Sequence, residues 1–323
     1  MNNKTTEDEL KNYEELIDMD KKCNNLEQDK LNKLFSNKKR IIQSLKKLKL
    51  KKVMIIILIL LFILIIFGYI LFKSFFGNNV KLKLIKVKNK QEISQVAGDI
   101  IIDIINKNPN PKISLTSGSL AKRIYKYLID KYEDNDISFL NTIFFSLDDY
   151  CGLDSNLKKS NYYFIKDNLL EHIDVNKNNV YLINTLSDNC KQNADIYNEL
   201  LSENQIDLYM INIGNNFNLG LNEPGTLFDS KTRVIELSLK QKEDIAELFD
   251  YDIKKIPVFG ITQGIDNILN SKNILVVANG KEKAEGIKYL IKGKFNKDIP
   301  ISAIKNYLGV IYIVADEEAC SLL

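Results

Sequence analysis

Short apolar segments that alternate with amphipathic helical stretches constrain this chain most. From about Glu92, a helical stretch at 92–107 precedes the strand-like segment "KISL", and a second helical stretch covers 120–132. Further strand-like segments follow, most of them separated by helical stretches: "NTIFFSL", "VYLI", "DLYMINI", "VFGIT", "ILVVAN" and "VIYIVA". This alternation predicts an α/β fold with a doubly wound, mostly parallel sheet.

A second feature is the apolar run "VMIIILILLFILIIFGYILF" at residues 53–72, which contains no charged residue. Its length suits a helix that crosses a bilayer. Because 52 residues precede the run, a retained anchor is favoured over a cleaved signal peptide. We therefore expect a single transmembrane helix at 53–72 and a single-pass membrane protein.

Basic segments lie on both sides of this run. In "KKRIIQSLKKLKLKK", Ile42, Leu45 and Leu48 have helical spacing, which predicts an amphipathic helix against anionic lipid; a solvated flank is the alternative. The count of basic residues favours a cytoplasmic N-terminus, but "KLKLIKVKNK" after the run is basic too. The side that the C-terminal domain faces therefore stays open.

These segments divide the chain into four parts. Residues 1–52 form a polar and then basic tail, 53–72 the membrane helix, 73–91 a linker and 92–323 the α/β domain. The net charge of +3 is too small to predict a nucleic-acid partner.

The cysteines and the lone histidine limit metal chemistry. With one histidine and no metal-ligand spacing among the cysteines, we expect no metal site. We interpret the cysteines as unpaired thiols in a reducing compartment. The C-terminal "CSLL" fits a prenylation motif at Cys320, which would require a cytosolic C-terminus, so this modification stays open. The cysteines are Cys23, Cys151, Cys190 and Cys320.

Polar residues follow several of the predicted strands, and in such sheets ligands bind outside the carboxyl ends of the strands. "TSGS" at 116–119 opens a helix, which suits a phosphate cradle, although a serine-capped helix start has the same pattern. Asp148 and Asp149 follow "NTIFFSL", and Glu223 lies in the stretch after "DLYMINI". Lys283 lies near a helix N-terminus, an unfavourable place for a cation unless an anion is bound nearby. Together they predict a site at one sheet edge.

The order of these motifs resembles the glucosamine-6-phosphate deaminase (isomerase) family, a relative of the 6-phosphogluconolactonases. The resemblance covers about 94–319, and it rests on "SLTSGSLAKRIYKYL", "FFSLDDYCGL", "INIGNNFNLGLNEPG", "SKTR", "GITQGIDNIL" and "GKEKA". It implies a Rossmann-like fold of the glucosamine-6-phosphate isomerase type, no cofactor, and in many members an oligomer. The family's reaction opens the ring of the amino-sugar phosphate, moves a proton between C2 and C1, and releases ammonia and fructose 6-phosphate.

The resemblance also implies a role for each matching residue. Asp148 matches the enolising general base, Asp149 stands where many members have glutamate, and Glu223 matches the support of the ring-opening histidine. The matches to the phosphate-binding residues are Ser117, Gly118, Ser119 and Lys283.

The chemical centre of the family's loop is changed. The loop's aspartate, glycine and histidine are replaced by Asn216, Phe217 and Asn218, and Glu247 falls near the position of a phosphate-binding arginine. An amide cannot shuttle a proton near neutral pH. We therefore expect a membrane-anchored, catalytically impaired or inactive deaminase-like domain that binds a sugar phosphate or a protein partner. The alternative is a divergent active deaminase that uses Asp148.

Overall fold

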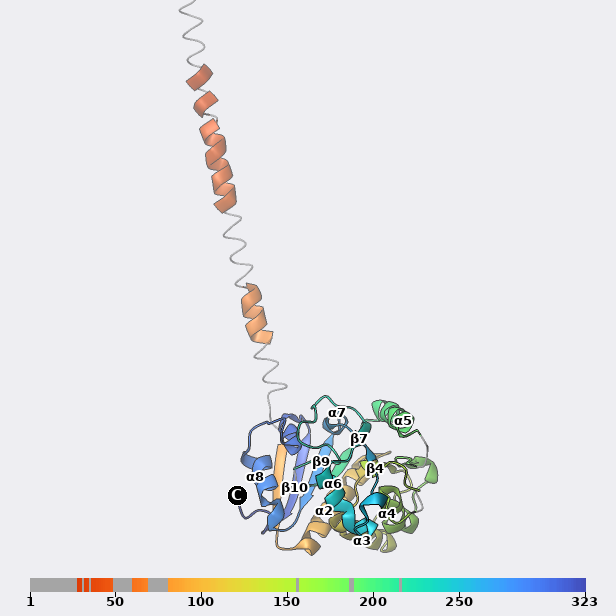
Figure 1. Ribbon diagram of the computed structural model, residues 1–323. Helices are drawn as coiled ribbons and strands as arrows, with labels where there is room; N and C mark the ends of the chain where they lie inside the picture. Colours follow the sequence, from red (N-terminus) through yellow and green to blue (C-terminus); the bar gives the residue numbers. More distant parts are fainter. Residues whose placement is uncertain are drawn as a thin grey trace, which may run out of the picture. The chain divides into compact units, whose positions relative to one another are not determined.

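The computed structural model divides the chain into two compact units, Met1–Gly77 and Asn78–Leu323. Figure 1 labels the elements of the second unit. The residues that the structure describes are 28–30, 32–34, 36–48, 60–68, 81–154, 157–185, 189–214 and 217–323.

In the first unit, residues 36–48 and 60–68 are helical. The helix at 36–48 includes the predicted positions Ile42, Leu45 and Leu48, and their side chains are exposed. Of the predicted membrane helix, residues 53–59 and 69–72 lie outside the described residues. Across the described ranges, no helix combines the length and the apolar character needed to cross a membrane.

The second unit is built on a seven-stranded sheet with the order β1-β10-β9-β6-β2-β3-β5. Every neighbouring pair in it is parallel. This confirms the predicted, mostly parallel α/β sheet. Its strands are β1 (Lys81–Val87), β2 (Lys112–Leu115), β3 (Ile143–Ser146), β5 (Val180–Tyr181), β6 (Leu208–Asn212), β9 (Asn273–Ala278) and β10 (Val310–Asp316).

Helices cover both faces of this sheet, so its central strands are buried on both sides. In β6, Leu208 and Met210 pack into the core under α2, α3 and α4, whereas Tyr209 and Ile211 pack into the core under α5, α7 and α8. This alternation follows from the two-residue period of a strand. The helices are α2 (Lys90–Lys107), α3 (Ser119–Glu133), α4 (Asn161–Asn168), α5 (Cys190–Glu203), α7 (Ile265–Leu269) and α8 (Ala284–Lys292).

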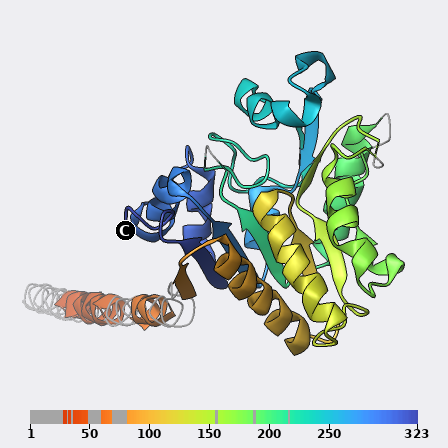
Figure 2. The same cartoon turned by 90° about the horizontal axis from the view of Figure 1, so that it is seen from below.

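A small antiparallel sheet stands beside the main sheet. It has the order β4-β8-β7, with β4 at Asp148–Tyr150, β7 at Arg233–Glu236 and β8 at Phe259–Thr262. Helix α6 (Leu239–Ile245) follows β7, and Figure 2 shows this cyan region projecting from the rest of the unit. The expectation that "VFGIT" belongs to the doubly wound sheet was therefore wrong, because the segment pairs with β4 and β7.

Residues 81–87 lie within the predicted linker at 73–91, but they form β1. This strand pairs with β10 along its whole length and forms one edge of the main sheet. The first helix also begins earlier than expected, because the side chain of Asn89 accepts a hydrogen bond from the backbone N–H of Glu92 and caps α2 at Lys90.

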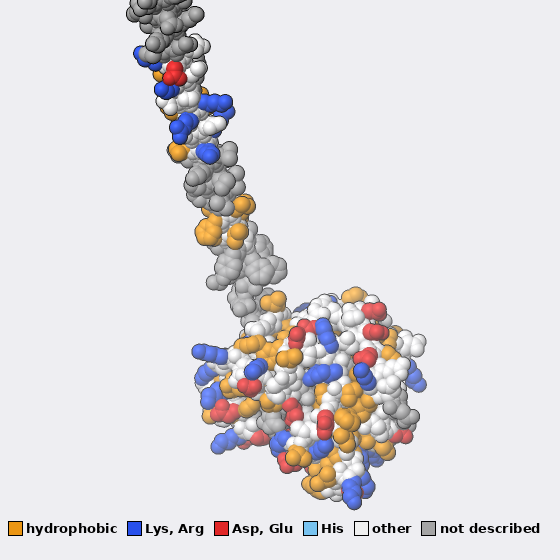
Figure 3. Space-filling view, turned by 45° about the horizontal axis from the view of Figure 1, so that its top comes forward, with side chains coloured by type: hydrophobic (Ala, Val, Ile, Leu, Met, Phe, Trp, Pro, Cys, Tyr) orange, Lys and Arg blue, Asp and Glu red, His pale blue; other side chains and the backbone are white. Residues whose placement is uncertain are grey.

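The surface of the second unit carries charges of both signs. On the face in Figure 3, basic and acidic side chains are interspersed among apolar ones. Near the C-terminus, Cys320 is only 5% exposed and belongs to the core under α5 and α8. Cys320 is therefore a free, buried cysteine in this structure.

Candidate active site

The main sheet brings the predicted site segments to one edge. Strands β9, β6, β2 and β3 are consecutive neighbours and run parallel, so their carboxyl ends meet at the same edge. Lys283 follows β9, Glu223 follows β6, Ser117 follows β2 and Asp148 follows β3. The sheet order therefore brings the starts of these four segments to one edge.

Asp148 is the buried acid of this edge, only 8% exposed. Its Oδ1 accepts a hydrogen bond of 2.6 Å from Nδ2 of Asn161. Its Oδ2 faces Gly220, where a Cβ atom would lie 2.9 Å from that oxygen. Burial, and next the charge of Asp149, raise the pKa of Asp148 to about 7, against the opposing bond from Asn161. A carboxyl group with such a pKa can act as a base near neutral pH.

Asp149 has a different environment. Its Oδ1 accepts from the backbone N–H groups of Tyr150 and Asn161, at 2.8 and 2.9 Å, and its Oδ2 accepts from the N–H of Tyr162 at 2.8 Å. Burial raises the pKa of Asp149, and these three bonds oppose the shift. The carboxylate therefore anchors the start of α4, and its oxygens are already occupied by backbone donors.

The loop after β6 carries the replaced positions, and Asn216 lies outside the described residues. The Nδ2 of Asn218 donates to the carbonyl of Gly220 at 2.8 Å. A Cβ at Gly214 would overlap Oδ1 of Asn218, so the amide folds back over its own loop. Asn218 thus supports the backbone beside Asp148 and supplies no titratable group.

Phe217 keeps the left-handed backbone that glycine favours, with φ of 59°. Its ring packs against Gly286 and lies 6.2 Å from the ring of Tyr289 on α8. Phe217 therefore adopts a backbone conformation that is more costly for a residue with a side chain than for glycine. The ring itself is accommodated by the core under α8, because Gly286 leaves room for it.

Glu223 lies at the small sheet. Its Oε1 accepts a hydrogen bond of 2.7 Å from Oγ of Ser238, the N-cap residue of α6. The preceding Asn222 is buried, donates to the carbonyl of Gln263 at 2.7 Å and accepts from Arg233 at 2.9 Å. These bonds fix the loop to β7, β8 and α6.

The predicted phosphate cradle is a glycine-capped helix start. Gly118 has φ of 115° and is the N-cap of α3, so the first N–H groups of the helix lack a side-chain cap. Such N–H groups attract an anion. Asn212, at the end of β6, donates to the carbonyl of Ser117 at 2.8 Å. Its buried Oδ1 finds no donor among the residues that the structure describes.

Lys283 lies directly before α8 and is half-buried, and this burial lowers the pKa of its amine. The charges of Glu282 and of Asp244 on α6 oppose the shift. Glu247, which falls near the position of the family's phosphate-binding arginine, has an exposed side chain, as does Asp244. Glu282 and Asp244 are the carboxylates whose charges act on Lys283.

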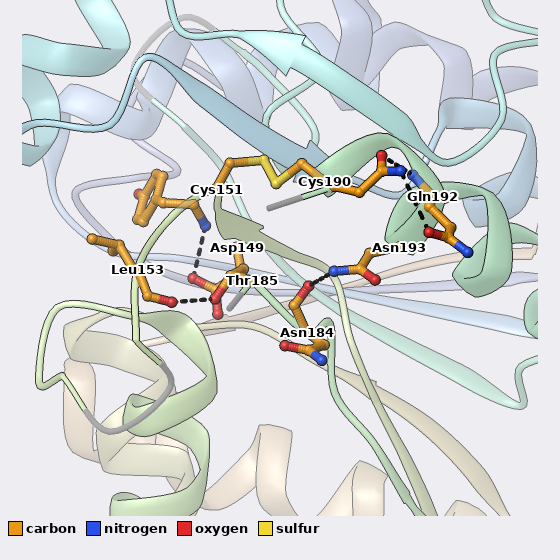
Figure 4. The surroundings of a disulfide bond; sticks show 10 residues. Asp149, Cys151, Leu153, Asn184, Thr185, Cys190, Gln192 and Asn193 are labelled. Carbon is orange, nitrogen blue, oxygen red and sulfur yellow. Dashed lines mark hydrogen bonds between the residues drawn. A yellow bond between two sulfur atoms is a disulfide. The ribbon is translucent and has the colours of Figure 1, made fainter. Parts of the chain in front are cut away.

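A disulfide lies next to the acidic pair, since Cys151 bonds to Cys190 at the start of α5 with an S–S distance of 2.07 Å. Figure 4 shows it with its neighbours, among them Thr185, whose hydroxyl donates to the carbonyl of Leu153 at 2.8 Å. The expectation of unpaired thiols was wrong for these two cysteines, because the fold brings positions 39 residues apart together.

Sequence reasoning missed two residues of this region, Asn161 and Asn212. Each contacts a predicted site residue through its side-chain amide. Asparagine is abundant along the whole chain, so neither position stood out. Asn161 had one weak signal, since it follows the helix-capping Ser160.

Comparisons with known proteins agree with this geometry. The model of the family "Glucosamine-6-phosphate isomerases/6-phosphogluconolactonase" matches residues 88–312. Glucosamine-6-phosphate deaminase of Mycoplasma mycoides is 37% identical over 243 residues, 75% of this chain and 98% of the relative. The enzyme of that name from Halalkalibacterium halodurans is 34% identical over 239 residues, 74% of this chain and 96% of the relative.

Solved structures give the same result. A monomeric glucosamine-6-phosphate deaminase matches with a TM-score of 0.71 and 32% identity, over 75% of this chain and 100% of its own. A 6-phosphogluconolactonase from Trypanosoma brucei matches with a TM-score of 0.64 and 18% identity, over 76% of this chain and 100% of its own. The second match concerns the fold alone.

Proposed function

The chain belongs to the family of glucosamine-6-phosphate isomerases and 6-phosphogluconolactonases, and on this basis we propose that it is a divergent, active glucosamine-6-phosphate deaminase. The observation that carries the proposal is Asp148, a buried carboxyl group with a pKa of about 7 and one oxygen facing the loop after β6. The relatives named glucosamine-6-phosphate deaminase favour this function over the inactive domain that the sequence analysis expected.

In the proposed reaction, Asp148 takes the proton from C2 of the open-chain sugar and returns it to C1, which leaves an imine at C2. Water then adds to C2 and the C–N bond breaks, so that ammonia leaves and fructose 6-phosphate forms. A base with a pKa near the working pH suits both transfers. We propose that the N-terminus of α3 and the amine of Lys283, which follow neighbouring parts of the same sheet edge, hold the phosphate.

Ring opening lacks the loop histidine, whose position is taken by Asn218. Asn218 cannot exchange a proton near neutral pH, and its amide is bonded to its own loop. We expect Asp148 to act on substrate that is already open. A positioned acid or base contributes about 100- to 10,000-fold in rate, and we expect turnover to be lower by that factor than with a histidine in the loop.

We also propose that residues 53–72 anchor the protein in a membrane with its N-terminus in the cytoplasm. The support is the apolar run without a charged residue and the basic segment before it. Protease protection of an epitope at each end, on intact membranes, tests both the anchor and its orientation. Extraction of the protein from membranes by salt alone would contradict the anchor.

The activity is tested with the full chain in detergent and glucosamine 6-phosphate, with ammonia and fructose 6-phosphate measured together. We expect equal amounts of both products, and Asp148→Asn should abolish their formation. Wild-type turnover no faster than that of Asp148→Asn would contradict the proposal. That result would favour the alternative function, a domain that binds a sugar phosphate without catalysis. A rise in melting temperature on addition of glucosamine 6-phosphate would then test for binding.

A further inference from the structure

We propose that Asn161 is a positioning residue that gives the two neighbouring aspartates separate roles. Its side chain holds one oxygen of Asp148 and leaves the other to carry the proton, while its backbone N–H helps to keep Asp149 as a helix anchor. The catalytic half of this inference rests on the proposed function, whereas the effect on Asp148 itself does not.

Asn161 bonds to both Asp148 and Asp149 and is itself held at the start of α4. The residue is 8% exposed and is the first residue of α4, whose N-cap Ser160 accepts from the N–H of Tyr163 at 3.0 Å. Its Nδ2 donates to both Oδ1 and the backbone carbonyl of Asp148, at 2.6 and 3.1 Å. Because side chain and backbone of one residue bond to adjacent acids, neither acid can turn without breaking a bond to Asn161.

The bonds to Asp149 make it a poor base. Both of its oxygens accept from backbone N–H groups, and its side chain is only 1% exposed. Protonation would weaken the bonds from Asn161 and Tyr162, which fix the start of α4. Hydrogen bonds to a carboxylate favour its charged form, so these bonds limit the rise in the pKa of Asp149 that burial causes. The charge of Asp149 in turn raises the pKa of Asp148.

At Asp148, the bond from Asn161 distinguishes the two oxygens. Oδ1 is engaged by the amide, whereas Oδ2 faces Gly220, a residue without a side chain. A Cβ atom at Gly220 would meet Oδ2 at 2.9 Å, so even alanine would crowd this oxygen. We therefore assign Oδ2 as the atom that exchanges the proton.

Few of the groups that face Asp148, apart from Asn161, can change its pKa. On its own strand these are Asp149, which raises its pKa, and Tyr150, whose hydroxyl is neutral at working pH because burial and both acids raise its pKa. The elements packed against it contribute Asn161 from α4, Thr262 from β8 and the loop at Gly220, none of which is charged. Loss of the Asn161 amide should therefore be visible as a rise in the pKa of Asp148.

The test compares Asn161→Ala with wild type by following the carboxyl titration of Asp148. Infrared difference spectra are assigned to this residue by their absence in Asp148→Asn. A hydrogen bond to a charged group corresponds to a shift of about one to two pH units, and we expect the midpoint to rise by that amount. With glucosamine 6-phosphate, the acidic limb of the kcat profile should move in the same direction while KM changes little.

The matched control is Asn168→Ala in the same helix, whose amide donates to the carbonyl of Phe164 at 2.9 Å and touches neither acid. It should leave the midpoint unchanged. If Asn161→Ala does not fold, Asn161→Gln retains an amide of altered reach and should still displace the midpoint. An unchanged midpoint in the folded variant would overturn the proposal. A shifted midpoint in a protein without turnover would refute the deaminase function and retain the positioning role.

Discussion

The hydroxyl of Ser238 donates a hydrogen bond of 2.7 Å to the carboxylate of Glu223. Ser238 is at the same time the N-cap of α6, where its Oγ accepts from the backbone N–H of Gln241 at 3.1 Å. One hydroxyl therefore joins the loop after β6 to the first turn of the helix that carries Asp244. In this chain, Glu223 stabilises the arrangement of loop and small sheet.

Ser238→Ala should destabilise the protein by more than the loss of an ordinary helix cap. The cap alone is worth about 1 kcal/mol, and the bond to Glu223 raises the expected loss to about 2 kcal/mol. Chemical denaturation measures the difference. Asn89→Ala, which removes the cap of α2 far from Glu223 in sequence, is the control and should cost about 1 kcal/mol. Equal losses in the two variants would mean that the bond to Glu223 adds nothing.

The raised pKa of Asp148 predicts how stability depends on pH. The folded state holds the proton up to about pH 7, whereas the unfolded chain releases it near the ordinary value of 3.8. The folded state therefore binds more protons between these values, and the contribution of Asp148 to stability falls as pH rises from 3.8 to about 7.

Asp148→Asn removes this charge, so the variant should melt higher than wild type at pH 8, by on the order of 5 °C, and show a smaller difference at pH 4. Melting curves at the two pH values measure it. The activity of the wild type should run in the opposite sense and rise with pH through about 7, as the base becomes deprotonated. A variant that is less stable than wild type at pH 8 would contradict the buried charge.

The disulfide between Cys151 and Cys190 should stabilise the domain under oxidising conditions. A bridge between positions 39 residues apart stabilises by about 4 kcal/mol if it acts on the entropy of the unfolded chain. Addition of a dithiol reductant should therefore lower the melting temperature.

The Cys151→Ala/Cys190→Ala double variant is the control and should melt at a temperature that the reductant does not change. Thiol titration of the unreduced, denatured protein should detect only Cys23 and Cys320. Four reactive thiols in protein prepared without reductant would rule the bridge out under those conditions.

Asp244 and Lys283 predict a change in phosphate affinity. The carboxylate of Asp244 acts on the amine of Lys283, so Asp244→Asn should free more of that positive charge for a sugar phosphate. We expect KM to fall by about fivefold, equivalent to ~1 kcal/mol, and Lys283→Ala should raise it. Glu243→Gln is the control, because Glu243 on the same helix pairs with Lys240. An equal fall in KM in that control would show that the change comes from the overall surface charge and not from the effect of Asp244 on Lys283.

The replaced loop can be tested by restoring the family residues. Asn216→Asp, Phe217→Gly and Asn218→His together should raise kcat by about 100-fold or more, because an imidazole can open the ring. The Phe217 ring packs against α8, so the triple variant should also be less stable. Asn216→Asp/Asn218→His keeps that packing and is the comparison. No gain in either folded variant would show that ring opening does not limit turnover.

Part of the site was predictable from local pattern. The strand before Asp148 and the strand before "TSGS" were recognisable as apolar segments, and in a parallel sheet the residues that follow such strands share one edge. The sheet order then placed the segments of Ser117, Asp148, Glu223 and Lys283 together without further information. The loop in which Asn218 replaces the family's histidine was also recognisable, because the neighbouring residues "NEPG" are retained.

The sequence by itself determined the α/β class, the parallel core strands and the identity of the acids, because these depend on residue type and on periods of two and 3.6 residues. The tertiary structure decided which groups meet: β1 with β10, β4 with β8, Cys151 with Cys190, and Asn161 with Asp148. Such pairs are far apart along the chain or lie at the ends of short elements, so no local period marks them. The different surroundings of Asp148 and Asp149, adjacent residues of the same type, arise from such contacts.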